Sequence, residues 1–261
     1  DIDKDLNPII NDDDNFDIIL IVNYFGFSQN LELYKKYISK KRCITIEDNS
    51  HGFLSRDLNG RLLGTRLEYG FISIYKSINI FNGSILINNT KNKVKSKKLV
   101  RKFKLTYFIK KLIYFKLSKS PDLNFKIYNL INFFKKLLKF KNKAKNNFDE
   151  IYLPNSTKIY DNFYLKSMPF NYVRDVERRR KIYLYIDKLL KNEKIIPIFK
   201  SLNNYTIPFC YPFYCEQENI KKLIKIVNMH KFVIVKWPDL PSTVKKKPSF
   251  YDTIYYITFK I

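Results

Sequence analysis

Residues 43–88 read CITIEDNSHGFLSRDLNGRLLGTRLEYGFISIYKSINIFNGSILIN, a stretch in which short apolar runs alternate with loops that contain glycine. The first apolar run ends in Glu47 and Asp48, and His51 follows shortly after. The second run, YGFISIY, is closed by a lone lysine, Lys76. Short apolar runs bounded by glycine are typical of strands. The stretch therefore predicts strands whose carboxyl ends carry an acid, an imidazole and an amine.

The segment just upstream predicts a βαβ unit. The continuous apolar run DIILIVN, residues 17–23, is typical of a strand buried on both faces of a parallel sheet. A helix is expected over residues 29–39 with Ser28 as its N-cap, and residues 42–47 form the second strand. Ligands in such sheets bind beyond the carboxyl ends of the strands, which is where Asp48 stands.

Downstream, the pattern predicts two more strands of this sheet and then a change of texture. The strands are expected at residues 69–75 and 84–88, followed by a basic helical region and a long helix at residues 172–192. Shorter elements follow: strands at 195–199, 206–214 and 232–235, and a helix at 217–229. The chain is thus divided into residues 1–90 as part of a large α/β domain, residues 91–171 as a basic helical connecting region, and residues 172–261 as a small α+β domain.

The net charge of +25 is confined to the second part of the chain. Residues 1–90 carry 10 lysines and arginines and 12 acidic residues, whereas the remaining 171 residues carry 39 and 12. Residues 91–145 alone hold 19 basic residues and one acid. Such a segment is either a solvated helical face or a surface that binds nucleic acid with a steep dependence on salt. We favour the solvated face.

The rarer residue types exclude several classes of site. Cys43, Cys210 and Cys215 are too few for a disulfide framework and lack metal-ligand spacing, so we expect a reducing cytoplasmic setting and no metal. No uncharged apolar run approaches the roughly 20 residues of a membrane span, so no membrane partner is expected. All six glycines precede residue 84, which directs the search for a ligand loop to the first third of the chain.

Asp48 and Lys76 together have the chemistry that pyridoxal 5′-phosphate (PLP) requires. A lysine holds this cofactor and moves a proton, an acid keeps the pyridine nitrogen protonated, and donors neutralise the phosphate. Taken separately, an aspartate after a strand is more commonly a turn residue, and a lysine there is more commonly a solvated edge residue. Their joint placement at strand ends favours the cofactor site.

The surrounding motifs resemble those of the DegT/DnrJ/StrS type of PLP-dependent sugar aminotransferases. IEDNSHG is similar to the family's I-E-D-x-x-H/Q motif, and SIYKSINIFNGSILINN is similar to its Ser/Lys loop with a later glycine. DIDKDLN resembles the family's entry segment, ERRRKIYLYIDKLL resembles the helix that opens the small domain, and Trp237-Pro238 resembles a late W-P-L-P segment. The resemblance implies PLP-dependent transferase fold type I, with a partial large domain, a mostly parallel sheet and a small C-terminal α+β domain.

The resemblance also implies roles for four residues. Lys76 would be the Schiff-base lysine and Asp48 the partner of the pyridine nitrogen, which makes them the catalytic pair. His51 would contact the hydroxyl or the face of the cofactor ring. Ser73 would contact the phosphate, although the serine usually stands five residues before the lysine and here the spacing is three, as in a variant S-x-R/Y-K form.

The implied activity is transfer of an amino group from an amino acid, with glutamate as the expected donor, to a nucleotide-linked keto sugar. The family works as a homodimer by a two-stage ping-pong mechanism, in cell-surface polysaccharide or amino-sugar biosynthesis. Its phosphate-binding segment precedes the entry segment at which this chain starts, so we expect a fragment of a longer protein or an impaired relative. The alternatives are a relative of the same fold without catalysis, and a nucleic-acid binder that uses residues 91–145.

Overall fold

The computed structural model describes residues 2–10, 16–35, 43–77, 83–92, 172–238, 240 and 247–259. Nearly all of the basic segment 91–145, which we interpret as a solvated face and alternatively as a nucleic-acid-binding surface, lies outside these residues. The same holds for most of the predicted connecting region 91–171. The fold is therefore described from its two ends, each of which contains a sheet.

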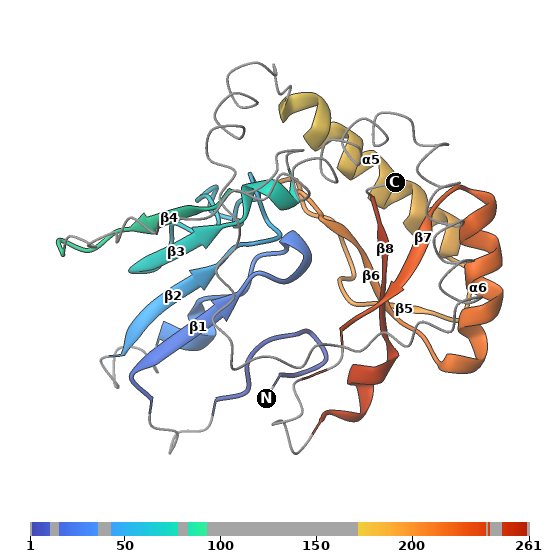
Figure 1. Ribbon diagram of the computed structural model, residues 1–261, viewed down its shortest axis with the longest axis horizontal. Helices are drawn as coiled ribbons and strands as arrows, with labels where there is room; N and C mark the ends of the chain where they lie inside the picture. The colour runs from blue at the N-terminus through green and yellow to red at the C-terminus, as the bar shows by residue number, and fades with distance from the viewer. Residues whose placement is uncertain are drawn as a thin grey trace, which may run out of the picture.

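The first sheet has four strands in the order β1-β2-β3-β4. Its strands are β1 (Ile18–Val22), β2 (Ile44–Asp48), β3 (Tyr69–Ile72) and β4 (Ile85–Asn88). β1, β2 and β3 run parallel, and β4 pairs antiparallel with β3. Figure 1 shows the three parallel strands pointing their carboxyl ends toward the second half of the protein. The mostly parallel sheet expected from the sequence is thus present.

Two details of the first sheet differ from the sequence-based expectation. The strand predicted at 69–75 ends at Ile72, and Ile74–Lys76 instead form a 3-10 turn, η2. The prediction that the first strand is buried on both faces is wrong, because Ile18 and Leu20 are 52% and 47% exposed. Alternate residues of a strand point to opposite faces, and in β1 only the face bearing Ile19 and Ile21 is packed.

The second sheet is antiparallel, with the strand order β5-β6-β8-β7. Its strands are β5 (Ile196–Pro197), β6 (Cys210–Tyr214), β7 (Val233–Lys236) and β8 (Ile254–Thr258). The helices α5 (Tyr172–Leu190) and α6 (Gln217–Met229) match the predicted helices closely. β8 was not predicted, although it lies between β6 and β7.

A hydrophobic core holds together the second sheet, the two helices beside it and the turn that follows β1. α5 contributes Tyr183, Ile186 and Leu190, and α6 contributes Leu223 and Val227. The 3-10 turn η1 (Tyr24–Gly26), which follows β1, adds Phe25 to the same core. No helix in the described part of the chain is long and apolar enough to cross a membrane.

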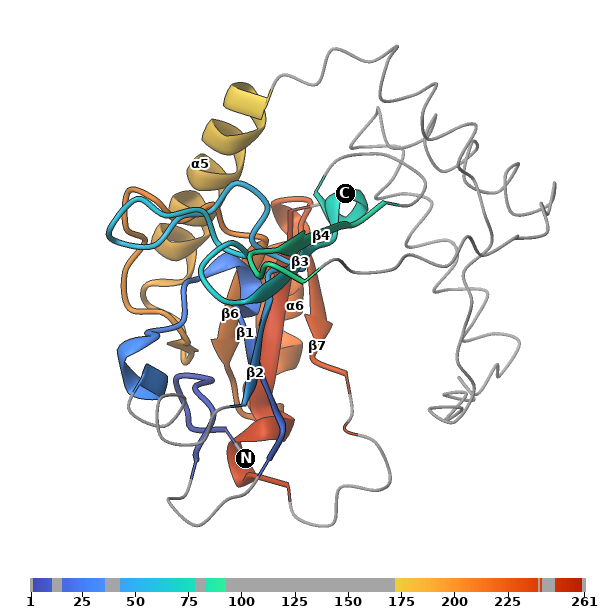
Figure 2. The ribbon, with the colours of Figure 1, turned by 90° about the vertical axis from the view of Figure 1, so that its left-hand side faces the viewer.

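The two halves also join through backbone contacts. The amide of Phe209 donates a 2.8 Å hydrogen bond to the carbonyl of Phe25, and the amide of Ile207 donates one of 2.9 Å to Ser55 Oγ. Gly26 has φ +92°, and a Cβ there would lie 2.6 Å from the carbonyl oxygen of Ile207. In Figure 2 the turn after β1 lies beside the second sheet. The carboxyl ends of β1 and β2 therefore face residues from the second half.

Candidate functional site

Asp48 is the last residue of β2 and stands at the carboxyl edge of the sheet. Its carboxylate accepts a 2.8 Å hydrogen bond from the backbone amide of Ser50, which fixes the turn after the strand. The preceding residue, Glu47, points to the opposite face of the sheet and is fully buried. The two consecutive acids therefore have different surroundings, and only Asp48 is partly open to solvent.

Lys76 and His51 lie in direct contact. The Lys76 Nζ is 3.3 Å from the His51 Nε2, although 25 residues separate them in the chain. Burial lowers the pKa of Lys76, and the nearby charge of Asp48 opposes that shift. Burial, together with the charge of Lys76, lowers the pKa of His51 to about 3. His51 is therefore neutral at physiological pH, and its Nε2 can accept a hydrogen bond from the lysine amine.

Aromatic side chains from both halves hold the imidazole of His51. The ring of Phe209 stacks on it with 4.4 Å between centroids and 6° between planes. Phe25 lies nearly parallel at 6.1 Å, and Trp237 approaches edge-on at 6.4 Å. Phe25 and Trp237 also pack on each other at 4.7 Å. These contacts fix the plane of the imidazole and so the direction in which Nε2 points.

Ser73 lies where β3 gives way to η2, the turn that carries Lys76. Its hydroxyl donates to the hydroxyl of Ser50 over 3.2 Å, and its carbonyl accepts the backbone amide of Lys76 at 3.2 Å. Ser50 in turn donates its amide to Asp48. The structure therefore brings Lys76 onto His51 directly and connects Ser73 to Asp48 through Ser50, while Asp48 acts on Lys76 through its charge.

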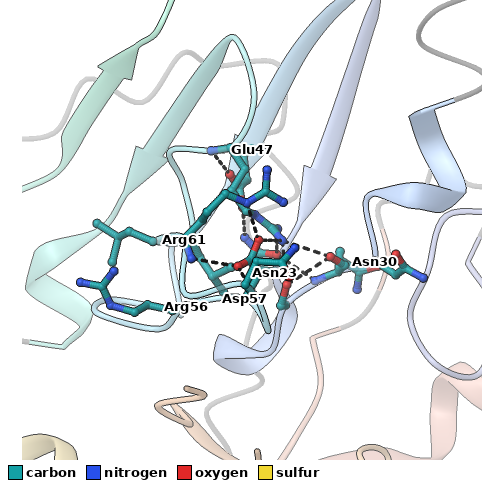
Figure 3. Close-up of polar contacts among 12 residues, drawn as sticks. Asn23, Asn30, Glu47, Arg56, Asp57 and Arg61 are labelled. Carbon is teal, nitrogen blue, oxygen red and sulfur yellow. Dashed lines mark hydrogen bonds and ion pairs between the residues drawn. The ribbon is translucent and has the colours of Figure 1, made fainter. Parts of the chain in front are cut away.

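A buried ionic network lies on the other face of the sheet, behind Asp48. The guanidinium of Arg66 lies 2.6 Å from the carboxylate of Glu47, and the amide of Asn23 donates to the same carboxylate at 2.8 Å. Asp57 lies 3.8 Å from Arg66. Figure 3 shows Asn23, Glu47 and Asp57 gathered at this point. The network joins the ends of β1 and β2 to the loop before β3, and the sequence analysis did not predict it.

The same network accounts for a wrong prediction at Ser28. Ser28 was expected to cap a helix, but its hydroxyl accepts a 2.7 Å hydrogen bond from Arg66. In the described part of that segment, residues 32–35 are helical, and the amide of Glu32 donates to Asn30 Oδ1 at 3.1 Å. Ser28 is engaged by Arg66 because a buried guanidinium needs more acceptors than one carboxylate provides, and Asn30 rather than Ser28 accepts an amide at the start of the helical residues.

No protein-family model and no curated protein matches this chain. Solved structures do match it. The aminotransferase PseC of Helicobacter pylori, involved in the biosynthesis of pseudoaminic acid, has a TM-score of 0.56 at 15% identity over 98% of this chain and 66% of its own. The aminotransferase TlmJ of Streptoalloteichus hindustanus has a TM-score of 0.55 at 13% identity, over 98% and 64%. A DegT DnrJ EryC1 StrS aminotransferase of Brucella abortus has a TM-score of 0.52 at 13% identity, over 92% and 58%.

The chain therefore has the fold of the DegT-type aminotransferases, which is PLP-dependent transferase fold type I. The fold class predicted from the sequence is confirmed, and so is the resemblance at the level of the fold. The chain spans about three fifths to two thirds of the length of these structures, from 58% to 66%.

Proposed function

We propose that this chain carries the lysine-bearing side of a PLP-dependent aminotransferase site. The observation that carries the proposal is the contact between Lys76 Nζ and a neutral His51 at 3.3 Å, beside the carboxylate of Asp48 at the end of the neighbouring parallel strand. A half-buried lysine amine with a lowered pKa is a nucleophile suited to a carbonyl group. An acid beside it is the second group that PLP requires.

The residues present fit the cofactor through the chemistry of their donor set. Lys76 would hold PLP through Nζ, Asp48 would pair with the pyridine nitrogen, and His51 would contact the ring. Ser73, with Ser50 beside it, supplies hydroxyl donors for the phosphate. When bound, PLP supplies an electron sink that allows an amino acid to lose its α-proton.

The remaining chemistry belongs to the side chains. Lys76 Nζ would take up the α-proton of the substrate and return a proton at the carbon that comes to bear the amino group. His51 cannot carry that proton, since its pKa is about 3, and it serves instead to orient the amine. Asp48 keeps a proton on the ring nitrogen because its carboxylate stabilises the positive charge there. Each role depends on the placement of these residues at the carboxyl edge of the first sheet.

For the substrates we propose an amino acid, with glutamate as the donor, and a nucleotide-linked keto sugar as the acceptor. The support is the motif resemblance, together with the likeness of fold to PseC, an enzyme of pseudoaminic acid biosynthesis. The same support leads us to propose a cytoplasmic homodimer that acts in cell-surface polysaccharide or amino-sugar biosynthesis. Residues outside the described part of the chain, or a partner subunit, would supply the rest of the phosphate site.

The test is covalent trapping followed by turnover. Purified protein is incubated with PLP, reduced with borohydride and digested, and mass spectrometry locates the adduct. We expect it on Lys76 in the wild type, and also in a Lys35→Ala control, which removes an exposed lysine of the same half. Lys76→Ala should lose the adduct, and it should also lose the visible absorbance that PLP shows before reduction when it is bound to a lysine as an imine. An adduct spread over many lysines, with none preferred at Lys76, would overturn the proposal.

Turnover separates an active enzyme from an impaired relative. Glutamate is supplied with nucleotide-linked keto sugars, and release of 2-oxoglutarate is followed. Product formation that depends on Lys76 supports the aminotransferase. A Lys76 adduct without product from any amino donor or keto sugar tested would favour a cofactor-binding relative that does not catalyse the reaction.

A further inference from the structure

Three consecutive arginines on α5 have three different sets of partners. Arg178 donates to Asp175 at 2.8 Å and to the carbonyl of Phe259 at 3.3 Å. Arg180 donates to the carbonyls of Asn203 and Thr206, at 2.7 and 2.6 Å. Both fasten α5 to its own half of the protein. Of the three, Arg179 alone, which lies between the other two, has a hydrogen-bond partner in the first half of the protein, at the end of the turn η2.

Arg179 is nearly inaccessible to solvent. Its side chain is 4% exposed and pairs with Asp175 over 2.6 Å, one turn earlier on the same helix. A guanidinium buried in this way is stable only when its charge and its donors are matched. Asp175 supplies the charge, and two hydrogen bonds from the guanidinium go to a single residue, Ser77. The Arg179 Nη2 donates to the Ser77 carbonyl at 2.9 Å, and Nη1 donates to the Ser77 hydroxyl at 3.3 Å.

Ser77 is the residue immediately after Lys76 and ends the turn η2. Its amide donates to the carbonyl of Ile74 at 2.9 Å, and the amide of Lys76 donates to the carbonyl of Ser73 at 3.2 Å. The turn is short, and a 3-10 turn has weaker hydrogen bonds than an α-helix. Its end is also held by the charged hydrogen bond from Arg179, and a hydrogen bond of that kind is roughly twice as strong as a neutral one.

The amine of Lys76 is also placed by the second half of the protein, by a separate route. His51, its contact at 3.3 Å, is stacked on Phe209, which precedes β6. The backbone of the lysine is thus held from α5, and the partner of its amine is held from the second sheet. A small movement of Ser77 would change the distance between Lys76 Nζ and His51 Nε2. It would do so without breaking the stacking of His51 on Phe209.

We propose that Arg179 is a positioning residue for Lys76. By donating to the carbonyl of Ser77, Arg179 holds the amine of Lys76 against His51. This inference rests on the proposed function only in taking Lys76 as the reactive lysine. The competing interpretation is that Arg179 merely fastens α5 to the end of the turn η2. In that case its replacement would change stability but not the behaviour of the lysine amine.

The experiment measures the reactivity of the Lys76 amine across pH. The full-length protein is labelled briefly with acetic anhydride, and acetylation of Lys76 is quantified by peptide mass spectrometry. The groups that face this amine are Asp48 and His51, and both stay unchanged. In Arg179→Lys the amine should leave its half-buried position, so the midpoint of its labelling curve should rise toward the ordinary value of 10.5. A rise of about one pH unit corresponds to about tenfold less free amine at neutral pH.

Two further variants keep the result interpretable. Arg178→Lys is the matched control, because it replaces the neighbouring arginine, which pairs with the same aspartate, Asp175. It should leave the labelling curve of Lys76 unchanged. Asp175→Asn keeps the Arg179 guanidinium but removes its charge partner, and it should shift the midpoint in the same direction. If Arg179→Lys fails to fold, Asp175→Asn decides. An unchanged midpoint in a folded Arg179→Lys, or in Asp175→Asn where that variant decides, would overturn the proposal.

Added PLP tests the proposed function within the same assay. PLP should protect Lys76 from acetylation if it binds there. Absence of protection counts against PLP binding but leaves the labelling midpoint, and hence the role of Arg179, open to measurement. The two proposals can therefore fail separately.

Discussion

The guanidinium of Arg66 lies 2.6 Å from the carboxylate of Glu47, with side-chain exposures of only 2% and 0%. Glu47 precedes Asp48 in β2, so the strand presents one acid to this buried pair and the next to the candidate site. Asn23, at the end of β1, accepts a 3.0 Å hydrogen bond from Arg66. The position of Asp48 is thus tied to a charged cluster on the far face of the sheet.

Removing the cation of this pair should destabilise the protein strongly. Arg66→Met leaves Glu47 buried without its charge partner, and the loss of one member of a buried pair costs about 3–5 kcal/mol. Urea unfolding of the wild type and the variant measures this difference. Lys35→Ala is the control, because Lys35 pairs with Glu32 at an exposed site, where an ion pair contributes about 1 kcal/mol or less. Equal losses in the two variants would show that the buried pair contributes no more to stability than an exposed one.

Only those residues of the candidate site that carry a local pattern could be proposed from the sequence. Asp48 and Lys76 were predicted as site residues because apolar runs end at each of them, which is a local signal, and because the motifs around them resemble a known family. Arg66 and Arg179 carry no such signal. Their partners lie 19 and 102 residues away, and only the folded chain brings them together. A fully buried acid does imply a cation, and that reasoning applied to Glu47 could have prompted a search for Arg66.

The elements of the fold that were predicted are likewise those with a local sequence pattern. The helices α5 and α6 were found because their apolar residues recur with the helical period. The turn η2 was mistaken for strand because YGFISIY has strand composition throughout, and nothing in it marks the change after Ile72. β8 was not predicted although its sequence, IYYIT, is rich in β-branched and aromatic residues, and only its place between β6 and β7 depends on pairing with distant strands.

Gly26 should resist substitution because it combines a positive φ with close backbone contact. Gly26→Ala would place a Cβ 2.6 Å from the Ile207 carbonyl oxygen, in a turn with φ +92°. The strained backbone costs about 1 kcal/mol or more, and the displacement of Ile207 adds to it. Gly60→Ala isolates the first part, because Gly60 has φ +79° and a Cβ added there would meet no atom within 4 Å. Urea unfolding should give the larger loss for Gly26→Ala, and equal losses would show that the contact with Ile207 yields easily.

The buried His51 should make stability depend on pH in the acid range. Its pKa is lowered to about 3 from an ordinary value of 6.5, so its stabilising contribution is fully present above pH 6.5 and is lost as the pH falls toward 3. At about pH 5 the loss amounts to roughly 2 kcal/mol at most. His51→Gln cannot titrate and should lose less stability between neutral pH and about pH 5 than the wild type does.

Urea unfolding at several pH values checks this prediction. His230→Gln is the matched control, because it removes the chain's other imidazole, which is exposed and contacts Tyr185. The difference in unfolding free energy between wild type and His51→Gln should shrink as the pH falls. A difference that stays constant with pH would contradict the burial of a neutral imidazole at this position.

Replacing Asp48 should separate attachment of the cofactor from turnover. The charge of Asp48 raises the pKa of Lys76, so Asp48→Asn should lower that pKa further and leave more free amine at neutral pH. Formation of the PLP adduct on Lys76 should therefore persist. Turnover should nevertheless fall by at least about a hundredfold, because the ring nitrogen loses the acid that keeps it protonated. Borohydride trapping measures the first quantity and 2-oxoglutarate release the second, with Asp252→Asn, at an exposed carboxylate near β8, as the control. If Asp48→Asn kept both adduct formation and turnover, another residue would have to pair with the ring nitrogen, because neither Lys76 nor His51 can replace a carboxylate in that role.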